Sequence, residues 1–402
     1  MRPKIIIITA VALVAMCTTV ASRPAGAEAP EPIRFATFNA SLNRAAAGVL
    51  EAQLVAATSD PPVVDPQLAT ILQIVANNEP DVLLINEFDT GVDGDRDGVT
   101  AMFAELAGYD YWYSAPSNTG VPSGFDLNNN GVIAGADDAL GFGFFPGQFG
   151  MAVFSNYPID EEGIRTFQTF LWQDMPGALL PLNADGTSWY SPEELDIFRL
   201  SSKSHWDVPI EVGNGKVVHF LVSHPTPPVF DTAEDRNGRR NFDEIRFWAD
   251  YVHPERSGYI YDDEGMFGGL APGASFVIAG DQNSDPLDGD SVPGAIQQLL
   301  DNPRVNARIA PTSEGAVEAA ELQDAINDLH RGDPAFDTAD FADTQPGNLR
   351  ADYVLPSKSI RIVDSAVYWP KQREDGSELT GVFPFPSSDH RLVWVDVAVP
   401  GT

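Results

Sequence analysis

Several apolar runs in this chain stop at an acid, an amide or an imidazole. The polar residues at their ends, in chain order, are Asn39, Glu87, His224, Asp281, Asn283, Asp389 and His390. Strands that end in this way bring hard oxygen ligands and a proton carrier to one rim of a sheet. The pattern is typical of an enzyme that hydrolyses phosphoesters with the help of a metal ion.

The order of these motifs resembles that of the endonuclease/exonuclease/phosphatase superfamily. The resemblance spans Ile33 to Val397, and its strongest motifs are GDQNSDP at 280–286 and SSDHRLVWVDV at 387–397, followed by DYVLPS at 352–357. It implies an α/β fold, a four-layer sandwich of two packed mixed β-sheets flanked by helices. It also implies in-line attack of an activated water on phosphorus, without a covalent enzyme intermediate.

The metal site is expected around Glu87. A phosphodiester resists attack because its oxygens are already negative, so catalysis requires charge neutralisation, an activated nucleophile and positioning. Mg²⁺ or Mn²⁺ would bind Glu87, since magnesium prefers a few carboxylate oxygens. The resemblance implies that Asn39 orients or completes this site and that Asp389 assists either the metal or the neighbouring histidine.

The resemblance also supplies the proton carriers. It implies that His390 acts as general base or as a proton donor to phosphate, and that Asp352 orients a histidine, His224, by accepting its ring proton. Asp281 and Asn283 are two residues apart in a segment expected to be extended, so their side chains should share one side. There they would orient the attacking water and hold a phosphate oxygen. An Asx turn is the alternative, and both can hold at once.

Basic residues near these motifs are candidates for binding substrate phosphate. Lys203 and His205 fall on one face of the strand expected at 195–211, which is alternatively a plain solvated face. Arg236 and Arg239 belong to the run DRNGRRN directly after the His224 loop. This run could bind a phosphate-bearing headgroup, or its arginines could simply pair with neighbouring acids.

A polar loop matches the spacing of an EF-hand-type calcium loop, with Asp in place of the usual terminal Glu. Its candidate ligands for a structural Ca²⁺ are Asp126, Asn128, Asn130 and Asp137. The flanking sequence does not predict paired helices, so this would be an isolated calcium loop. A plain polar turn is the alternative.

The N-terminus has the features of a secretory signal peptide over residues 1–27: Arg2 and Lys4, an apolar stretch, then Ala25-Gly26-Ala27. Residues 28–402 are expected to form one catalytic domain with acidic loop insertions at 89–100 and 117–149. Its sole cysteine lies in the signal, so the exported chain would contain no disulfide. We expect a secreted, extracellular protein.

Charge bears on the substrate. The whole chain has a formal net charge of −34, with 24 basic and 58 acidic residues. Such a surface repels polyanions and disfavours nonspecific binding to duplex nucleic acid. Small molecules or lipid headgroups are therefore favoured over DNA or RNA as the phosphoester substrate, although an extracellular nuclease stays open. We expect a monomer without a stable protein partner. A different class of function would be a calcium-stabilised binding protein on an inactive hydrolase scaffold.

Overall fold

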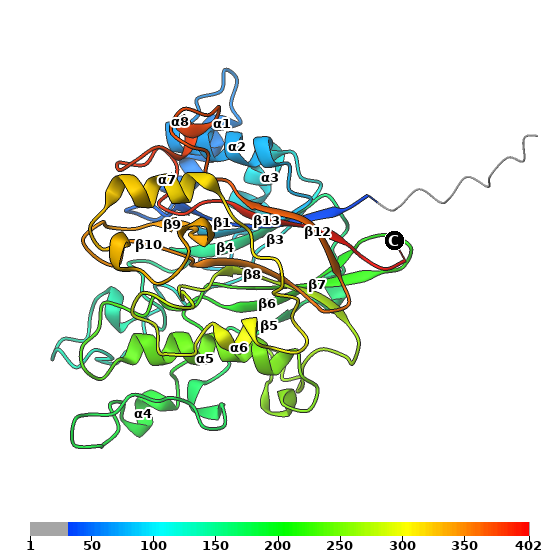
Figure 1. The fold of residues 1–402 in the computed structure, drawn as a ribbon. Helices are drawn as coiled ribbons and strands as arrows, with labels where there is room; N and C mark the ends of the chain where they lie inside the picture. Colours follow the sequence, from blue (N-terminus) through cyan, green and yellow to red (C-terminus); the bar gives the residue numbers. More distant parts are fainter. Residues whose placement is uncertain (1–30, 402) are drawn as a thin grey trace, which may run out of the picture. The chain divides into compact units, whose positions relative to one another are not determined.

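Two stacked β-sheets with helices on both outer faces form the centre of the structure (Figure 1). This computed structural model describes residues 31–401, so the signal peptide predicted at 1–27 lies outside the described residues. Pro32–Thr402 form one unit. Within the described part, no helix combines the length and the apolar character needed to cross a membrane. The α/β sandwich expected from the sequence is confirmed.

The first sheet has six strands in the order β12-β13-β1-β2-β4-β3. Their bounds are β1 Ile33–Leu42, β2 Val82–Phe88, β3 Tyr111–Tyr113, β4 Gly150–Ser155, β12 Arg361–Val367 and β13 Val393–Ala398. β1 and β2 are parallel and central, and the other neighbours are antiparallel. Nearly every side chain of β1 and β2 is buried, because both faces of the sheet are covered.

The second sheet has five strands in the order β11-β8-β7-β6-β5. Their bounds are β5 Arg165–Thr166, β6 His205–Glu211, β7 Val217–Ser223, β8 Ser275–Asp281 and β11 Asp352–Pro356. β7 and β8 are parallel, like β1 and β2 in the first sheet. A separate short pair consists of β9 Ala339–Asp340 and β10 Asn348–Leu349.

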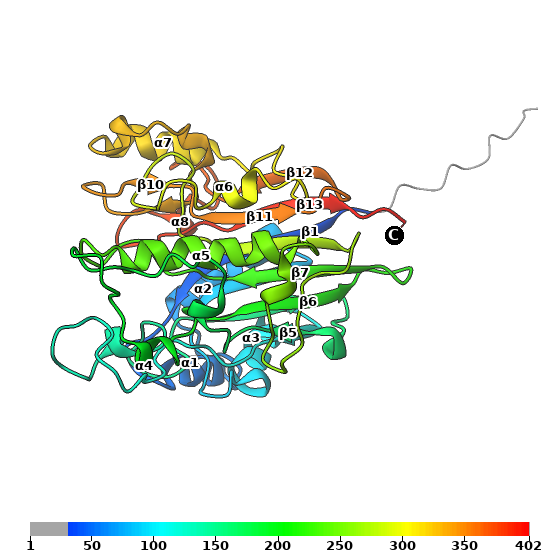
Figure 2. The same ribbon diagram turned by 90° about the horizontal axis from the view of Figure 1, so that it is seen from below.

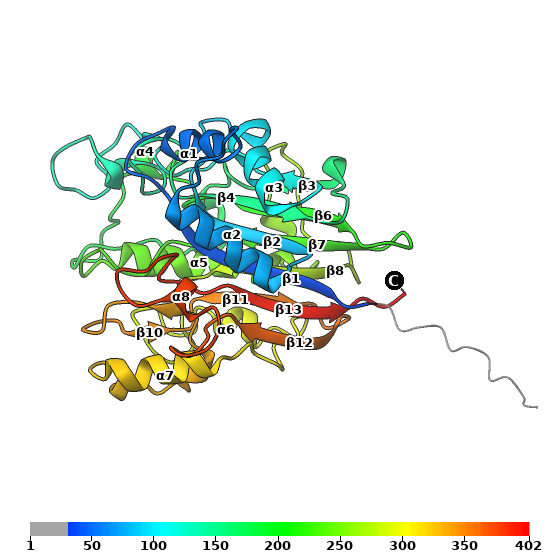
Figure 3. The ribbon, with the colours of Figure 1, turned by 90° about the horizontal axis from the view of Figure 1, so that it is seen from above.

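Helices cover the outer faces of both sheets. They are α1 Val49–Ala57, α2 Pro66–Asn78, α3 Ala101–Ala107, α4 Pro192–Leu195, α5 Arg236–Tyr251, α6 Gln297–Leu300, α7 Glu314–Gln323 and α8 Ser377–Thr380. Figure 3 shows α1, α2 and α3 over the first sheet, and Figure 2 shows α5 across the second. α2 begins at Pro66 because the Asp65 carboxylate accepts hydrogen bonds from the next free backbone N–H groups.

Three hydrophobic cores separate the four layers. The central core lies between the sheets, where the rings of Phe35 on β1 and Phe220 on β7 approach to 5.5 Å. A second core joins the first sheet to α1, α2 and α3. The third joins the second sheet to α5 and the loops around it. This packing fixes both sheets rigidly, which matters because the polar residues stand at their edges.

One strand differs from the sequence-based expectations. The strand expected at 195–211 starts only at His205. Residues 199–204, directly before β6, form a loop, so their side chains need not alternate between two faces.

Candidate active site

The predicted catalytic residues meet at one edge of the sandwich. Asn39 lies near the end of β1, Glu87 near the end of β2, and Asp281 at the end of β8, while His224 directly follows β7. An amide hydrogen bond of 3.0 Å from Nδ2 of Asn39 to Oδ2 of Asp281 links the two sheets at this edge. Parallel pairing within each sheet brings these strand ends together.

Asn39 holds two carboxylates in place. Its Nδ2 donates to Oδ2 of Asp281 and, at 3.2 Å, to Oε1 of Glu87, while its Oδ1 accepts from the backbone N–H of Ser41 at 3.3 Å. The side chain is buried, so its orientation is fixed by these partners. Of the two roles expected for Asn39, this geometry favours orienting the acids over binding the metal.

Asp352 pairs with His390 and not with His224. The distance from Nδ1 of His390 to Oδ2 of Asp352 is 2.8 Å, and the hydroxyl of Thr338 donates to the same oxygen at 2.8 Å. The expectation that Asp352 orients His224 is therefore wrong. β11 lies at the sheet edge next to β8, and this places Asp352 opposite Asp281 and beside the loop that carries His390.

The pair has strongly shifted proton affinities. Burial lowers the pKa of His390, but the charges of Asp352 and Asp281 outweigh burial and raise it well above its ordinary value. Burial also raises the pKa of Asp352 to about 6, against the lowering effect of His390. His390 is consequently a cation at neutral pH, which suits a proton donor.

Asp281 lies between two imidazoles. Its Oδ2 is 3.3 Å from Nε2 of His224 and 3.6 Å from Nε2 of His390. Although burial raises the pKa of Asp281, the charges of His390 and His224 bring it below its ordinary value, so it is ionised. Burial, followed by the charge of Lys203, lowers the pKa of His224 to about 4. The neutral His224 therefore donates its Nε2–H to Asp281 and leaves Nδ1 without a partner among the described residues.

Glu87 occupies an irregular position in its strand. The pairing register between β2 and β4 shifts between Asn86 and Phe88, and Glu87 has a φ of 56°, in the left-handed region. This bulge turns the carboxylate toward the cavity that it helps to line. Burial raises the pKa of Glu87, and the charge of Asp389 raises it further.

A divalent cation fits this donor set. The charge of Asp389 acts on Glu87 and raises its pKa beyond the effect of burial, and hard carboxylate oxygens are what Mg²⁺ binds. Oδ1 of Asp389 lies 3.5 Å from the hydroxyls of Ser41 and Ser388. These long contacts orient the carboxylate and leave it able to bind a cation.

A second group of atoms also has metal-binding geometry. The ligand atoms of Asp281, Asp352 and His390 lie within 4.8 Å of one another. The hydrogen bond between Asp352 and His390 occupies two of those ligands, so we interpret this group as the proton-carrying part of the site.

Asn283 forms the Asx turn that was the alternative for the GDQN motif. Its backbone N–H donates to Oδ1 of Asp281 at 2.9 Å, and its φ is 50°. Its Nδ2 donates to the carbonyl of Pro225 at 3.1 Å. The segment is not extended at Asn283, so the expectation that the two side chains point to the same side for that reason is wrong. The turn instead fixes the Asp281 carboxylate.

His205 does not reach the site, whereas Lys203 does. The ring of His205 is 1% exposed, with Nδ1 2.6 Å from the hydroxyl of Ser201 and Nε2 2.9 Å from the carbonyl of Glu244. Burial lowers the pKa of His205 to about 3. This position corrects the expectation that His205 binds substrate phosphate. Lys203 precedes the strand, lines the cavity beside Glu87 and His224, and has a pKa lowered by burial.

The arginines of DRNGRRN lie on the first turns of α5 and not in a loop. Arg236 lines the cavity and forms an ion pair with Glu234. Arg239 is not among the cavity-lining residues, which disagrees with its expected phosphate contact. Arg240, the third arginine of this run, is buried, lines the cavity and donates to the carbonyls of Leu200 and Leu140 at 2.8 and 2.7 Å. Helical spacing from Arg236 would have placed it on the same face.

The candidate calcium loop is closed by a different acid from the one expected. The Asp126 carboxylate accepts from the N–H groups of Asn130 and Gly131 at 3.0 and 2.7 Å. Asp138 accepts from Leu127 and Ala134 at 3.0 Å each. Asp137, the acid expected at the end of the loop, lines the cavity, and its part in calcium binding stays a prediction. Calcium binding by Asp126, Asn128 and Asn130 stays a prediction.

Comparison with known proteins identifies the family of this chain. A family model described as "Endonuclease/Exonuclease/phosphatase family" matches residues 36–390. The chain belongs to this family. A comparison with curated proteins found no significant match.

Several solved structures are similar to this chain, one of them described as an endonuclease/exonuclease/phosphatase. One from Beutenbergia cavernae is 17% identical, with a TM-score of 0.49, 92% of this chain and 72% of that chain covered. Beta toxin from Staphylococcus aureus, a mutant with bound magnesium ions, is 13% identical, with a TM-score of 0.42 and coverages of 91% and 99%. The human Nocturnin catalytic domain with bound sulfate is 14% identical, with a TM-score of 0.42 and coverages of 91% and 93%.

Family membership assigns the protein to the metal-dependent hydrolases that act on phosphoester bonds. The geometry agrees with this class, because it gathers carboxylates, an amide, two imidazoles and a lysine at one edge.

Proposed function

We propose that this protein is an exported phosphodiesterase or phosphatase that uses Mg²⁺ or Mn²⁺ and acts on small or lipid phosphoesters in preference to long nucleic acids. The observation that carries the proposal is a row of contacts at one edge: Asp352 hydrogen-bonds to His390, and Asp281 lies within ion-pair distance of both His390 and His224. Asn39 joins Asp281 to Glu87 through two hydrogen bonds. The net charge of −34 supports the preference against polyanions.

Each residue has a distinct role in the proposed reaction. A cation held by Glu87 and Asp389 would neutralise charge on the phosphate. The ionised Asp281, fixed by Asn39 and the Asx turn, orients the attacking water and accepts its proton. The protonated His390 donates a proton to the phosphate or to the leaving alkoxide, and Asp352 positions its ring.

Lys203 and His224 complete the arrangement. The Lys203 ammonium lines the cavity between the acids and the aromatic wall, where it can donate to a phosphate oxygen. The neutral His224 holds Asp281 in its orientation through Nε2. The bond to phosphorus forms in line with the bond that breaks, so no residue of the enzyme becomes covalently modified.

A substrate panel tests this proposal. Purified protein would be incubated with bis-p-nitrophenyl phosphate, p-nitrophenyl phosphate, sphingomyelin and plasmid DNA, each with Mg²⁺, Mn²⁺, Ca²⁺ or a chelator. We expect hydrolysis of at least one of the first three that depends on a divalent ion and exceeds the cleavage of DNA. Inactivity on all four with every metal would favour a binding protein on an inactive scaffold. Preferential cleavage of DNA would favour an extracellular nuclease.

Export is part of the same proposal. It rests on the basic and apolar segments and the Ala25-Gly26-Ala27 site within residues 1–27. N-terminal sequencing of protein recovered from a culture of its host should begin close to Glu28. A start at Met1 would contradict export through a cleaved signal.

A further inference from the structure

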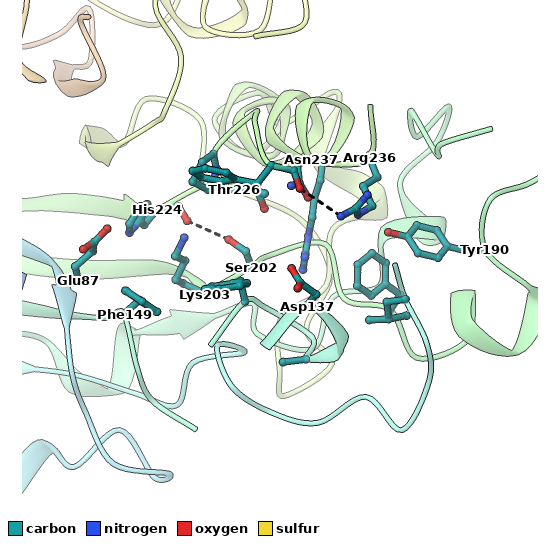
Figure 4. A pocket seen from close by; sticks show the side chains of 17 residues that line it. Glu87, Asp137, Phe149, Tyr190, Ser202, Lys203, His224, Thr226, Arg236 and Asn237 are labelled. Carbon is teal, nitrogen blue, oxygen red and sulfur yellow. Dashed lines mark hydrogen bonds between the residues drawn. The ribbon is translucent and has the colours of Figure 1, made fainter. Parts of the chain in front are cut away.

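A cavity extends from the catalytic residues along the N-terminal end of α5. Figure 4 shows Glu87 and His224 at one end, with Tyr190 and Arg236 at the other. Its volume is about 470 Å³, within the range of sites that enclose one small organic ligand. Because Lys203 and His224 line it directly, the organic part of an ester whose phosphate lies at these residues would extend into this cavity.

Several aromatic rings contribute to the walls of this cavity. Tyr190 and Phe198 are 4% and 3% exposed, and their ring centroids lie 4.8 Å apart. Phe142 and Phe149 line the outer part, with ring centroids 6.2 Å apart. Flat rings in such walls favour a planar apolar group, which gains both burial and ring contacts.

These aromatic residues come from long loops between the strands. Phe142 belongs to the segment 117–149, and Tyr190 and Phe198 belong to the connection between β5 and β6. The catalytic edge is built by strand ends, whereas the cavity is built by loops. The loops can therefore set which ester reaches the catalytic residues.

Two polar groups in the cavity, a hydroxyl and a guanidinium, are candidates for contacting a bound group. The Oγ1 atom of Thr226 is buried without a hydrogen-bond partner, which costs free energy unless a ligand supplies one. The buried Arg240 donates its hydrogen bonds to backbone carbonyls, and its guanidinium lies 4.6 Å from the centroid of the Phe198 ring. Burial lowers the pKa of Arg240, and the charge of Glu244 offsets part of this effect. A hydroxyl and a positive charge beside aromatic walls favour an anionic acceptor on the bound group.

We propose, on the basis of the proposed function, that this cavity binds the organic part of a small phosphoester, and that this part is a compact aromatic group with a negatively charged substituent. The phosphate end of the substrate would lie at Lys203 and His224, the ring between Phe198 and Phe142, and the substituent near Thr226 and Arg240. The enclosed volume suits one such group and not a polymer.

Phosphonates test the cavity without depending on turnover, because their P–C bond is not hydrolysed. Methylphosphonate, benzylphosphonate and 4-carboxybenzylphosphonate would be titrated into the full-length mature protein with Mg²⁺ by calorimetry. We expect benzylphosphonate to bind at least about 10-fold more tightly than methylphosphonate, since burying the ring removes apolar surface from water. The carboxylate should add a further several-fold.

Four variants complete the test. Phe198→Ala should bring the ratio of the affinities for benzylphosphonate and methylphosphonate toward one. Phe142 is half-exposed, so Phe142→Ala is less demanding for folding, and it should lower the same ratio. Thr226→Val keeps the shape of the side chain but removes its hydroxyl. It should reduce the ratio of the affinities for 4-carboxybenzylphosphonate and benzylphosphonate. Phe383→Ala removes an exposed ring outside the cavity lining and should change neither ratio.

The outcomes separate this inference from the proposed function. Equal binding of methyl- and benzylphosphonate to the unaltered protein, or ratios indifferent to Phe198→Ala and Phe142→Ala, would overturn the cavity assignment. Tighter binding of a 20-nucleotide DNA strand than of benzylphosphonate would also overturn it. Selective benzylphosphonate binding by a protein that hydrolyses no phosphoester would support the cavity and reject the proposed function.

Discussion

The Oδ2 atom of Asp352 lies 2.8 Å from Nδ1 of His390, and both side chains are buried. This contact directs Nε2 of His390 toward Asp281. It also supplies the negative charge that keeps the imidazole protonated. Asp352 is thus a positioning residue whose effect is exerted through His390.

Asp352→Asn should lower kcat by about 100-fold with little change in KM, within the range of general acid–base effects. The asparagine removes a charge that raises the pKa of His390, so the alkaline limb of the pH–rate profile should move to lower pH. Asp207→Asn is the matched control, because Asp207 forms a comparable 2.8 Å contact with His219 outside the site. A reduced rate with an unmoved alkaline limb would mean that Asp352 acts only in folding.

Glu87→Gln should weaken the response to Mg²⁺. The amide keeps the size of the side chain but removes the charge that binds a hard cation. We expect the Mg²⁺ concentration for half-maximal rate to rise by at least about 10-fold, together with a lower kcat. A magnesium titration of the rate measures both. An unchanged half-maximal concentration would place the metal elsewhere, with Asp281, Asp352 and His390 as the next candidates.

Lys203→Met should lower kcat/KM by about 10- to 100-fold, because it removes a donor to the phosphate. The melting temperature should hold or rise, since Lys203 is buried and desolvation lowers its pKa. The charge of Lys203 also lowers the pKa of His224, so NMR titration of His224 should give a higher value in the variant. A large loss of stability would show that Lys203 is structural.

Asp337→Asn should stabilise the protein at pH 8 but not at pH 4. Burial, aided by the charges of Asp285 and Asp288, raises the pKa of Asp337 to about 8. An acid with a raised folded-state pKa destabilises the fold once the pH exceeds its unfolded value, and the penalty grows until the folded pKa is reached. Between these two pKa values, the free energy of unfolding of the variant should exceed that of the unaltered protein by up to about 1.4 kcal/mol more for each pH unit.

Denaturant unfolding at several pH values measures this effect. The exposed Asp328→Asn serves as the control and should show no such trend. Lower stability of Asp337→Asn than of the unaltered protein at pH 8 would contradict the prediction, because it would mean that the carboxylate is ionised and favourably paired.

Strand ends were predictable from the sequence because an apolar run that stops at a polar residue is a local pattern. Asn39, Glu87 and Asp281 accordingly lie together at one edge. The partner of Asp352 was not predictable, since it depends on how β11 lies beside β8 and the following loops. His205 was misplaced because alternation was extended into a segment that is a loop. The run DRNGRRN did not show that Arg236 and Arg240, rather than Arg239, line the cavity, because that depends on which face of α5 packs against it.

The most direct test of the central claim is the rate of bis-p-nitrophenyl phosphate hydrolysis by His390→Ala and by the unaltered protein, each with Mg²⁺ and with chelator. The unaltered protein should hydrolyse the ester only with the metal. His390→Ala should lose at least about 100-fold in rate with Mg²⁺ while melting at a similar temperature. A near-normal rate in a folded His390→Ala protein would contradict the account.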